Sequence, residues 1–511
     1  MNQLPEVITA LLQPSQYPDE CPQQVELLQT QMSFVLLTGK YAYKIRKPVN
    51  LGYVDYSTLE KRKLFSEKEL TLNRRLCPGA YIGLVPVVRN DKGKIQLGGE
   101  GKLVDYAVKM KRLPISGMMD HLLQTDGLTI DMAEAVARKM AGFHDEAATG
   151  DDINRFGSLE TIRGNIEENF EQSRPYIGQA LSQAHFDALK GYFDRFLADR
   201  SAMLENRIAG NHIRDCHGDL HSAHVNFNGD AICVYDCIEF NDRFRYGDTA
   251  SEIAFLAMDL DRHGRSDLRQ VFVREYVRAS GDRRLYGLLK FYQAYRAHIR
   301  AKVACFKMED PCVSAEEKAA ELDKARGYFD LALAYTLPQP QLFITNGLTG
   351  CGKSTLAAAL TRHLGLRHIS SDVTRKTTSG PAAVTPSPEN TGRTYNAMLH
   401  EAGKVLAGGE SAILDATFLR RADRDAALGL AAQYSAEAMI IECRLGELEI
   451  LERLEQRQKA ENVSDGCREL YLKQKELLEP VNELPIGRNH VIIDTQETLE
   501  ANLRQIVDLL V

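Results

Sequence analysis

The chain of 511 residues is too long for a single ordinary hydrophobic core, so its length favours two to four domains. A hydrophobic content of 44% and a charged content of 26% are typical of globular proteins. The net charge of −7 argues against a general nucleic-acid binder, and it leaves open a small anionic substrate or a nucleic-acid end.

Two further features of the composition exclude whole classes of protein. No apolar run reaches the roughly eighteen residues of a membrane helix, and the first residues lack the basic start of a signal peptide. The ten cysteines have no paired metal-binding spacing, so we expect reduced thiols. The sequence therefore predicts a cytoplasmic protein with no membrane partner.

The N-terminal part of the chain has the pattern of a β-rich region with one helix. Strands are predicted at Ser33–Gly39, Tyr41–Lys47, Tyr81–Val88 and Leu103–Met110. Lys44 projects from the second of these among apolar neighbours. The helical segment Ser57–Leu76 carries Glu69 and its rival Glu67, and a mostly helical region follows from Met118 to about Ala209. This order is the outline of a two-lobed kinase.

Two carboxylates flank a strand predicted at Ala231–Tyr235. Asp219 precedes the strand in the loop segment His217-Gly-Asp, and Asp236 follows its end. Phosphoryl transfer needs one carboxylate that accepts the proton of a hydroxyl and another that holds Mg²⁺ on the phosphates. The segment therefore predicts a phosphotransferase site.

These residues resemble the catalytic loop and metal-binding aspartate of the aminoglycoside phosphotransferase-like kinases, which are relatives of protein kinases. The resemblance implies a two-lobed protein-kinase-like domain in which Asp219 is the catalytic base and Asp236 the metal ligand. It also implies that His217 supports the loop and that Lys44, paired with Glu69, contacts the α- and β-phosphates.

One position departs from the family pattern. An Asn usually stands seven residues after the His of the loop and binds a second metal ion, whereas this chain has His224 there. Imidazole is a poor ligand for Mg²⁺, and Asn226 could replace it only in a reshaped loop. Catalysis with one metal ion, slow transfer and a regulatory pseudokinase all remain open. The spacing of His217, His221 and His224 does not support a separate metal site.

A proline pair marks the predicted domain boundary. Helices are expected as far as Tyr335, and the segment Leu337-Pro-Gln-Pro340 then interrupts the pattern. We therefore expect a kinase-like domain over residues 1–336 and a second domain over residues 341–511.

The second domain opens with a phosphate-binding loop. The apolar strand Leu342–Asn346 leads into a glycine-rich segment and then into a helix, which is the order that a P-loop requires. Lys353 supplies a charge for the β- and γ-phosphates, and the Ser354 hydroxyl can bind Mg²⁺. The residues predicted to bind nucleotide here are Gly347, Leu348, Thr349, Gly350, Cys351, Gly352, Lys353, Ser354 and Thr355. The expected cofactors are ATP, with GTP possible in one domain, and Mg²⁺.

Strands and helices alternate in the rest of this domain, which predicts a parallel sheet with helices on both faces. Asp372 and Asp415 each end a predicted strand, where ligands bind in such sheets. The helix Leu445–Lys459 carries Arg453 and Arg457 four residues apart, so both can close over a transferring phosphate as a lid.

This half resembles the small P-loop kinases of the polynucleotide kinase, gluconate kinase and zeta-toxin group, most closely at Ser371-Asp-Val-Thr-Arg375. The resemblance implies that Asp372 is the general base and that Arg375 holds an anionic group of the substrate. It also implies that Asp415 acts on Mg²⁺ and that Thr377–Arg393 closes over the acceptor. Nothing resembles the arginine sensors of hexameric AAA machines.

The order of the two halves resembles bacterial two-domain proteins described as bifunctional aminoglycoside phosphotransferase/ATP-binding proteins. The resemblance implies a phosphotransferase with two ATP sites that transfers the γ-phosphate to a hydroxyl of a small molecule or nucleic-acid end, with the P-loop domain as the better candidate for activity. A single P-loop kinase with a regulatory N-terminal pseudokinase, and a non-catalytic ATP-binding switch, are the alternatives.

Overall fold

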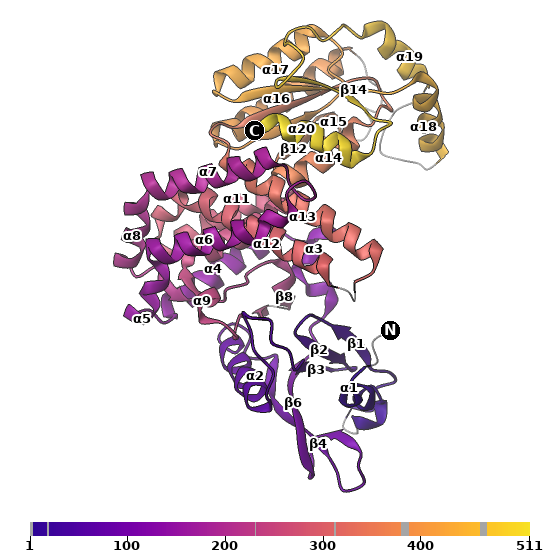
Figure 1. The fold of residues 1–511 in the computed structure, drawn as a ribbon. Helices are drawn as coiled ribbons and strands as arrows, with labels where there is room; N and C mark the ends of the chain where they lie inside the picture. The colour runs from indigo at the N-terminus through magenta and orange to yellow at the C-terminus, as the bar shows by residue number, and fades with distance from the viewer. Residues whose placement is uncertain (1–3, 18–19, 230, 311–312, 380–387, 460–467) are drawn as a thin grey trace. The chain divides into compact units, whose positions relative to one another are not determined.

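The computed structural model describes residues 4–17, 20–229, 231–310, 313–379, 388–459 and 468–511 (Figure 1). The chain divides into two compact units, each treated by itself. Unit 1 comprises Met1–Ile162, Arg200–Asp259 and Val271–Gly287, and unit 2 comprises Arg163–Asp199, Leu260–Gln270 and Leu288–Val511. Within the described ranges, no helix has the length and apolar character needed to cross a bilayer.

Unit 1 begins with a 6-stranded antiparallel sheet in the order β1-β2-β3-β6-β4-β5. Its strands are β1 (Glu26–Gln29), β2 (Ser33–Leu37), β3 (Tyr41–Arg46), β4 (Tyr81–Arg89), β5 (Ile95–Leu97) and β6 (Lys102–Lys111). Tyr43 and Ile45 of β3 join a core with α1 (Glu6–Leu11) on one face. Because side chains alternate along a strand, Lys44 and Arg46 point to the opposite face.

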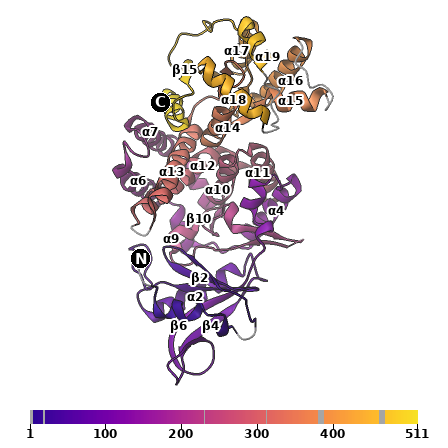
Figure 2. The ribbon, with the colours of Figure 1, turned by 90° about the vertical axis from the view of Figure 1, so that its right-hand side faces the viewer.

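Helix α2 (Leu59–Asn73) packs on that opposite face, beside β4 and β6 (Figure 2). Thr58 caps its first turn by accepting a hydrogen bond from the Lys61 amide. Leu70 of α2 contributes to the core on this face of the sheet. Helix α2 therefore presents its buried side to the two basic residues of β3.

The rest of unit 1 is mostly helical, with two short antiparallel strand pairs. Its helices are α3 (Met119–Gln124), α4 (Ile130–Glu146), α5 (Asp151–Asn154), α8 (Ser201–Ala209) and α9 (Asp242–Arg245). The strand pairs are β7 (Ile213–Asp215) with β10 (Tyr246–Asp248) and β8 (Val225–Asn228) with β9 (Ala231–Val234). Helices α6 (Leu159–Ser173), α10 (Thr249–Arg262) and α11 (Ser266–Ser280) belong partly to each unit.

Unit 2 contains a 5-stranded parallel sheet in the order β12-β13-β11-β14-β15. Its strands are β11 (Gln341–Asn346), β12 (Arg367–Ser370), β13 (Ala412–Asp415), β14 (Glu437–Arg444) and β15 (His490–Asp494). All six residues of β11 are buried, as expected for the central strand of a covered parallel sheet. The end of β13 therefore lies beside the end of β11.

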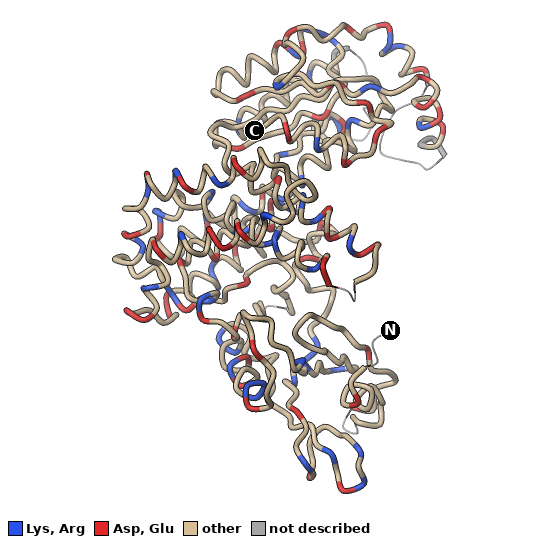
Figure 3. The backbone as a smooth tube through the Cα atoms, viewed as in Figure 1, with Lys and Arg blue, Asp and Glu red and all other residues tan. Residues whose placement is uncertain are grey.

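Helices cover both faces of this sheet (Figure 1). They are α14 (Lys353–Leu364), α15 (Ser371–Ser379), α16 (Pro388–Ala407), α17 (Arg421–Gln433), α18 (Glu447–Lys459), α19 (Arg468–Leu477) and α20 (Leu499–Val507). Unit 2 also includes α7 (Gln183–Asp199), α12 (Leu289–Glu309) and α13 (Ala315–Thr336). Residues of both charges are distributed along the helices of this unit (Figure 3).

One buried acidic residue ties α13 to the P-loop helix within unit 2. Asp330 of α13 is fully buried, and its Oδ2 lies 2.7 Å from His363 Nδ1 of α14. Arg504 of α20 also pairs with this carboxylate. Burial alone would raise the pKa of Asp330, but these two partners outweigh it and lower the pKa.

The predicted fold class is confirmed: a protein-kinase-like arrangement of sheet and helices precedes a parallel P-loop sheet. Two expectations are wrong. Asp372 does not end a strand, because β12 stops at Ser370 and Asp372 lies in the first turn of α15, where a carboxylate is favourable. Cys77 and Cys233 form a disulfide and are not reduced thiols. The domain boundary at residues 336–341 stays a prediction.

Candidate functional site

Lys44 stands at the centre of the first candidate site, in unit 1. Its Nζ donates to Glu69 Oε1 at 2.9 Å and to Asp236 Oδ1 at 2.7 Å. Glu67 is exposed and pairs instead with Lys63. The structure therefore brings together Lys44, Glu69 and Asp236, whose predicted roles stay predictions.

A second cation reinforces this cluster. Arg46 donates to Glu69 Oε2 at 2.6 Å, and its other guanidinium nitrogen lies 2.6 Å from Glu239 Oε1. Burial alone would raise the pKa of Asp236, but the Lys44 ammonium holds that pKa well below its usual range. Asp236 therefore stays ionised near pH 7.

Backbone and side-chain contacts hold the loop that carries Asp219. Glu252 of α10 accepts hydrogen bonds from the backbone amides of His217 and Gly218, at 3.0 and 2.6 Å. His217 Nε2 lies 2.9 Å from the Tyr235 carbonyl oxygen, so this nitrogen carries the proton and donates. Burial lowers the pKa of His217 to about 4, and the ring is neutral near pH 7. The supporting role that the resemblance implies for His217 stays a prediction.

The position that departs from the family pattern lies inside this site. His224 Nδ1 is 2.9 Å from the Asp219 carbonyl oxygen, and His224 Nε2 is 3.6 Å from Asp236 Oδ2. Asn226 is completely buried and donates its amide to the Pro114 carbonyl oxygen at 2.9 Å. His224 therefore lies beside Asp236, whereas the Asn226 amide is directed to Pro114.

The second candidate site, in unit 2, is the glycine-rich loop between β11 and α14. Gly347 has φ 136°, and a Cβ there would lie 2.5 Å from the Cys443 carbonyl oxygen. Gly352 caps α14 in the left-handed conformation, with φ 89°. Both positions require glycine, and the loop ends at a helix N-terminus where backbone N–H groups can bind phosphate.

Lys353 and Ser354 begin α14 at the mouth of this loop. Lys353 Nζ donates to the Leu348 carbonyl oxygen at 2.6 Å, so its ammonium lies over the loop. Ser354 Oγ donates to Asp415 Oδ1 at 3.2 Å. The other carboxylate oxygen of Asp415 lies 3.0 Å from His368 Nε2 on the neighbouring strand.

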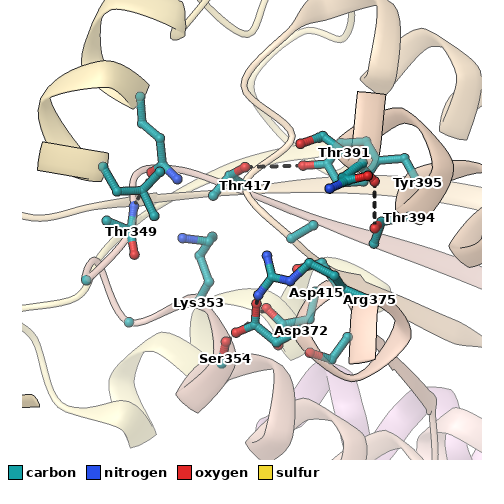
Figure 4. Close-up of a pocket in the computed structure, with 18 residues that line it drawn as sticks. Thr349, Lys353, Ser354, Asp372, Arg375, Thr391, Thr394, Tyr395, Asp415 and Thr417 are labelled. Carbon is teal, nitrogen blue, oxygen red and sulfur yellow. Dashed lines mark hydrogen bonds and ion pairs between the residues drawn. The ribbon is translucent and has the colours of Figure 1, made fainter. Parts of the chain in front are cut away.

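Asp372 and Arg375 face the same hollow from α15 (Figure 4). Arg375 Nη2 donates to Asp372 Oδ1 at 3.0 Å. The hollow has a cavity volume of about 150 Å³ and is partly open to solvent. A carboxylate, a guanidinium and the glycine-rich loop thus share one pocket.

Two residues that the sequence analysis missed line this pocket. Gln474 Oε1 accepts a hydrogen bond from the Thr349 amide of the loop at 2.8 Å. The Tyr395 hydroxyl oxygen lies 3.1 Å from Thr417 Oγ1. It also accepts a hydrogen bond from the Phe418 amide. His368 was missed too. His368 could have been noticed in the sequence, because it lies in a predicted strand of the same sheet as Asp415. Gln474 and Tyr395 could not, because they come from helices far along the chain.

The structure describes the side chain of only one of the two arginines predicted to form a lid, Arg453. Arg453 lies against the loop rather than in the pocket: it donates to the Thr495 carbonyl oxygen at 3.1 Å, beside Gly352. Arg457 belongs to α18, but its side chain lies outside the described part of the structure. Of the predicted acceptor lid Thr377–Arg393, residues 380–387 also lie outside it.

The oxygen donors of the P-loop site suit Mg²⁺. Ser354 Oγ and Asp415 Oδ1 form a pair of hard ligands beside the phosphate loop, and Mg²⁺ prefers such ligands together with phosphate oxygens. In the first site Asp236 offers the same chemistry, whereas the His224 imidazole does not. The two sites therefore differ in how well their residues fit this ion.

The two sites define the class of protein: a protein-kinase-like fold is followed by a P-loop nucleotide-binding domain. A family model described as "AAA domain" matches residues 342–481. That description is broader than the small P-loop kinase group that the sequence resembles.

The chain is 30% identical over 405 residues to uncharacterized protein Rv2004c of Mycobacterium tuberculosis and, equally, to Mb2027c of Mycobacterium bovis. Each alignment covers 77% of this chain and 78% of the mycobacterial protein. The chain therefore belongs to the same family as these mycobacterial proteins.

Solved structures show more distant likenesses. Choline kinase from Cryptosporidium parvum is 9% identical, with 64% of this chain and 94% of that chain covered and a TM-score of 0.39. A gluconokinase from Sinorhizobium meliloti is 21% identical, with 34% of this chain and 92% of that chain covered and a TM-score of 0.26.

Proposed function

We propose that the chain is an ATP-dependent phosphotransferase whose principal active site is the P-loop pocket. One observation carries the proposal: Lys353, Ser354, Asp415, Asp372 and Arg375 line a single hollow at the carboxyl end of the sheet (Figure 4). A plain nucleotide-binding loop needs only the first three. A carboxylate and a cation from α15 supply what an acceptor hydroxyl requires.

The proposed reaction moves the γ-phosphoryl group of ATP to a hydroxyl. The loop amides and Lys353 hold the phosphates, and Ser354 and Asp415 would hold Mg²⁺, which neutralises charge on the β- and γ-oxygens. Asp372 accepts the proton as the hydroxyl oxygen bonds to phosphorus. The bond between the γ-phosphorus and the bridging oxygen breaks, and ADP leaves.

Arg375 gives the acceptor its proposed chemical character. Its guanidinium reaches the pocket beside the base, where it can hold an anionic group of the acceptor by paired hydrogen bonds. A phosphorylated or carboxylated small molecule, or a nucleic-acid end, carries both an anionic group and a hydroxyl. ATP is the proposed donor, with GTP as the alternative in one domain.

The first site is proposed as a second nucleotide site. Lys44 is already paired with Glu69 and Asp236, which supports nucleotide binding there. His224 beside Asp236 favours the alternative in which this domain regulates the P-loop kinase and transfers phosphate slowly or not at all. A non-catalytic ATP-binding switch is the remaining alternative.

The test is transfer of labelled γ-phosphate to a panel of metabolites and oligonucleotides by the full chain. Asp372→Asn should lower the transfer rate by about 10² to 10⁴, because the general base is lost, with little change in nucleotide affinity. Asp425→Asn, at an exposed carboxylate of α17, is the matched control and should leave the rate unchanged.

Asp219→Asn separates the two sites in the same assay. Loss of transfer in this variant, together with normal transfer in Asp372→Asn, would move the active centre to unit 1 and contradict the proposal. Turnover at background level on every acceptor, with tight ATP binding, would favour the switch.

A further inference from the structure

A disulfide of unit 1 joins the two segments that supply partners to Lys44. Cys77 lies just after the end of α2, the helix that carries Glu69. Cys233 lies in β9, the strand that leads to Asp236. The two cysteines are 156 residues apart in sequence and are 4% and 7% exposed, in the core between α2 and the sheet. The bond therefore ties the segment of Glu69 covalently to the segment of Asp236.

We propose that this disulfide is a reversible redox clamp on the site around Lys44. In the oxidised form it holds the end of α2 against the turn at Asp236, so both ion pairs of Lys44 stay assembled. In the reduced form the two segments separate more readily, and the affinity of this site for nucleotide falls. The effect on nucleotide rests on the proposed second nucleotide site, whereas the clamping of α2 to β9 does not.

Hydrogen bonds beside the disulfide join the same two segments. Asn73, the last residue of α2, accepts a hydrogen bond from the Cys237 amide at 2.8 Å and donates to the Glu69 carbonyl oxygen at 2.9 Å. The Tyr81 hydroxyl accepts a hydrogen bond from the Asp236 amide at 3.2 Å. These two acceptors flank the cysteine of this segment. A shift of the segment therefore moves groups that hold both carboxylate partners of Lys44.

The backbone of Asp236 makes this turn dependent on its surroundings. Its φ of 62° lies in the left-handed region, which is unfavourable for a residue with a side chain. Such a conformation persists only where the surrounding structure holds it. The carboxylate of the same residue accepts from Lys44 Nζ at 2.7 Å. Loosening the end of α2 therefore weakens the support of both the turn and its ion pair.

Reduction requires a dithiol and local opening of the chain. One thiolate of the dithiol bonds to a sulfur of the disulfide, and the other cysteine leaves as a thiolate that takes up a proton. The second thiol of the dithiol then displaces the first cysteine, which also ends as a thiol. The chain gains two electrons and two protons, and the dithiol becomes a disulfide. Among the described strands β9 pairs only with β8, and a two-stranded pair opens readily, which exposes Cys233.

Hydrogen exchange of the full chain without nucleotide tests the clamp, in the disulfide form and after reduction by dithiothreitol. Exchange in β9 and in the last turn of α2 should become faster by about 10-fold or more, because a disulfide typically contributes at least that much to stability. Exchange in α14 should not change. Unchanged exchange after full reduction, a disulfide that resists excess dithiothreitol in the folded chain, or equal thiol counts before and after reduction would overturn the proposal.

Nucleotide binding is measured in Lys353→Ala, so that the P-loop site does not contribute. Reduction should weaken the binding of a non-hydrolysable ATP analogue by about 5- to 150-fold, the usual range for two coupled sites. By reciprocity, saturating analogue should raise by the same factor the ratio of reduced to oxidised dithiothreitol that half-opens the disulfide. Unchanged affinity, where Lys44→Met abolishes the same binding, would overturn the proposal. Binding that Lys44→Met does not alter would contradict the second nucleotide site instead, and hydrogen exchange alone would then decide the clamp.

Two variants control for effects of the reductant. The double variant Cys77→Ala, Cys233→Ala should match the reduced wild type in exchange and affinity and should not respond to dithiothreitol. Cys305→Ala removes a buried thiol of α12 outside the disulfide and should respond like the wild type. A full response in the double variant would overturn the proposal. The comparison of oxidised with reduced wild type needs no substitution, so it decides the proposal if the double variant does not fold.

Discussion

The two candidate sites are built in different ways. The P-loop site depends on backbone geometry: Gly347 and Gly352 adopt conformations that other residues resist, and the loop ends at a helix N-terminus. The site of unit 1 depends on charged side chains that neutralise one another, with Lys44 between Glu69 and Asp236. A glycine loop is local in sequence, whereas the second arrangement needs the whole unit to fold.

The helix that follows the glycine loop is nevertheless held by a residue far away in the sequence, Asp330. Removing this residue gives the largest effect that we expect on stability. Asp330→Ala removes the buried carboxylate that pairs with His363 of α14 and Arg504 of α20. Removing one partner of a buried ion pair typically costs about 3–5 kcal/mol. We expect a loss of this size in the unfolding free energy of unit 2, measured by hydrogen exchange of the buried strands.

Asp323→Ala is the control on the same helix, because Asp323 is exposed. Equal stability of the Asp330 and Asp323 variants would show that the P-loop fold does not depend on α13. That result would also favour residues 341–511 as an independent domain, since the predicted boundary separates His363 and Arg504 from Asp330.

The site of unit 1 should respond to acid through His217. Its pKa is about 4 in the folded chain, and an unfolded histidine has a pKa near 6.5, so the unfolded state binds more protons between these values. The stability from the neutral ring is therefore present above pH 6.5 and lost as the pH falls toward 4. Between pH 7 and pH 5 this histidine contributes a loss of about 2 kcal/mol.

Hydrogen exchange of β8 and β9 at the two pH values, corrected for intrinsic rates, measures this loss. His217→Asn should show a pH dependence smaller by that amount. An unchanged slope in the variant would mean that His217 does not titrate as its burial requires.

The sequence predicted the parts of both sites that lie close together along the chain. The glycine loop and the segment around Asp219 could be found from the spacing of neighbouring residues. In the structure the first lies between β11 and α14, and the second forms a loop before β8. Asp372 illustrates a limit: strand and helix meet at Ser370 and Ser371, so a one-residue boundary decided its setting. Boundaries of this kind depend on tertiary packing as well as on pattern.

Long-range contacts set the remaining limit. Gln474 and Tyr395 reach the P-loop pocket from helices that sequence patterns cannot position against it. His224 was read as a departure from a family pattern, but its distance from Asp236 depends on how the loop folds back on β9. The pairing of Cys77 with Cys233 across 156 residues is likewise a product of the fold.

Calorimetric titration of the full chain with a non-hydrolysable ATP analogue and Mg²⁺ tests the central claim most directly. The account predicts nucleotide binding that Lys353→Ala removes from the P-loop site, with the site around Lys44 still able to bind. Wild-type affinity in Lys353→Ala, with all binding lost in Lys44→Met, would contradict it.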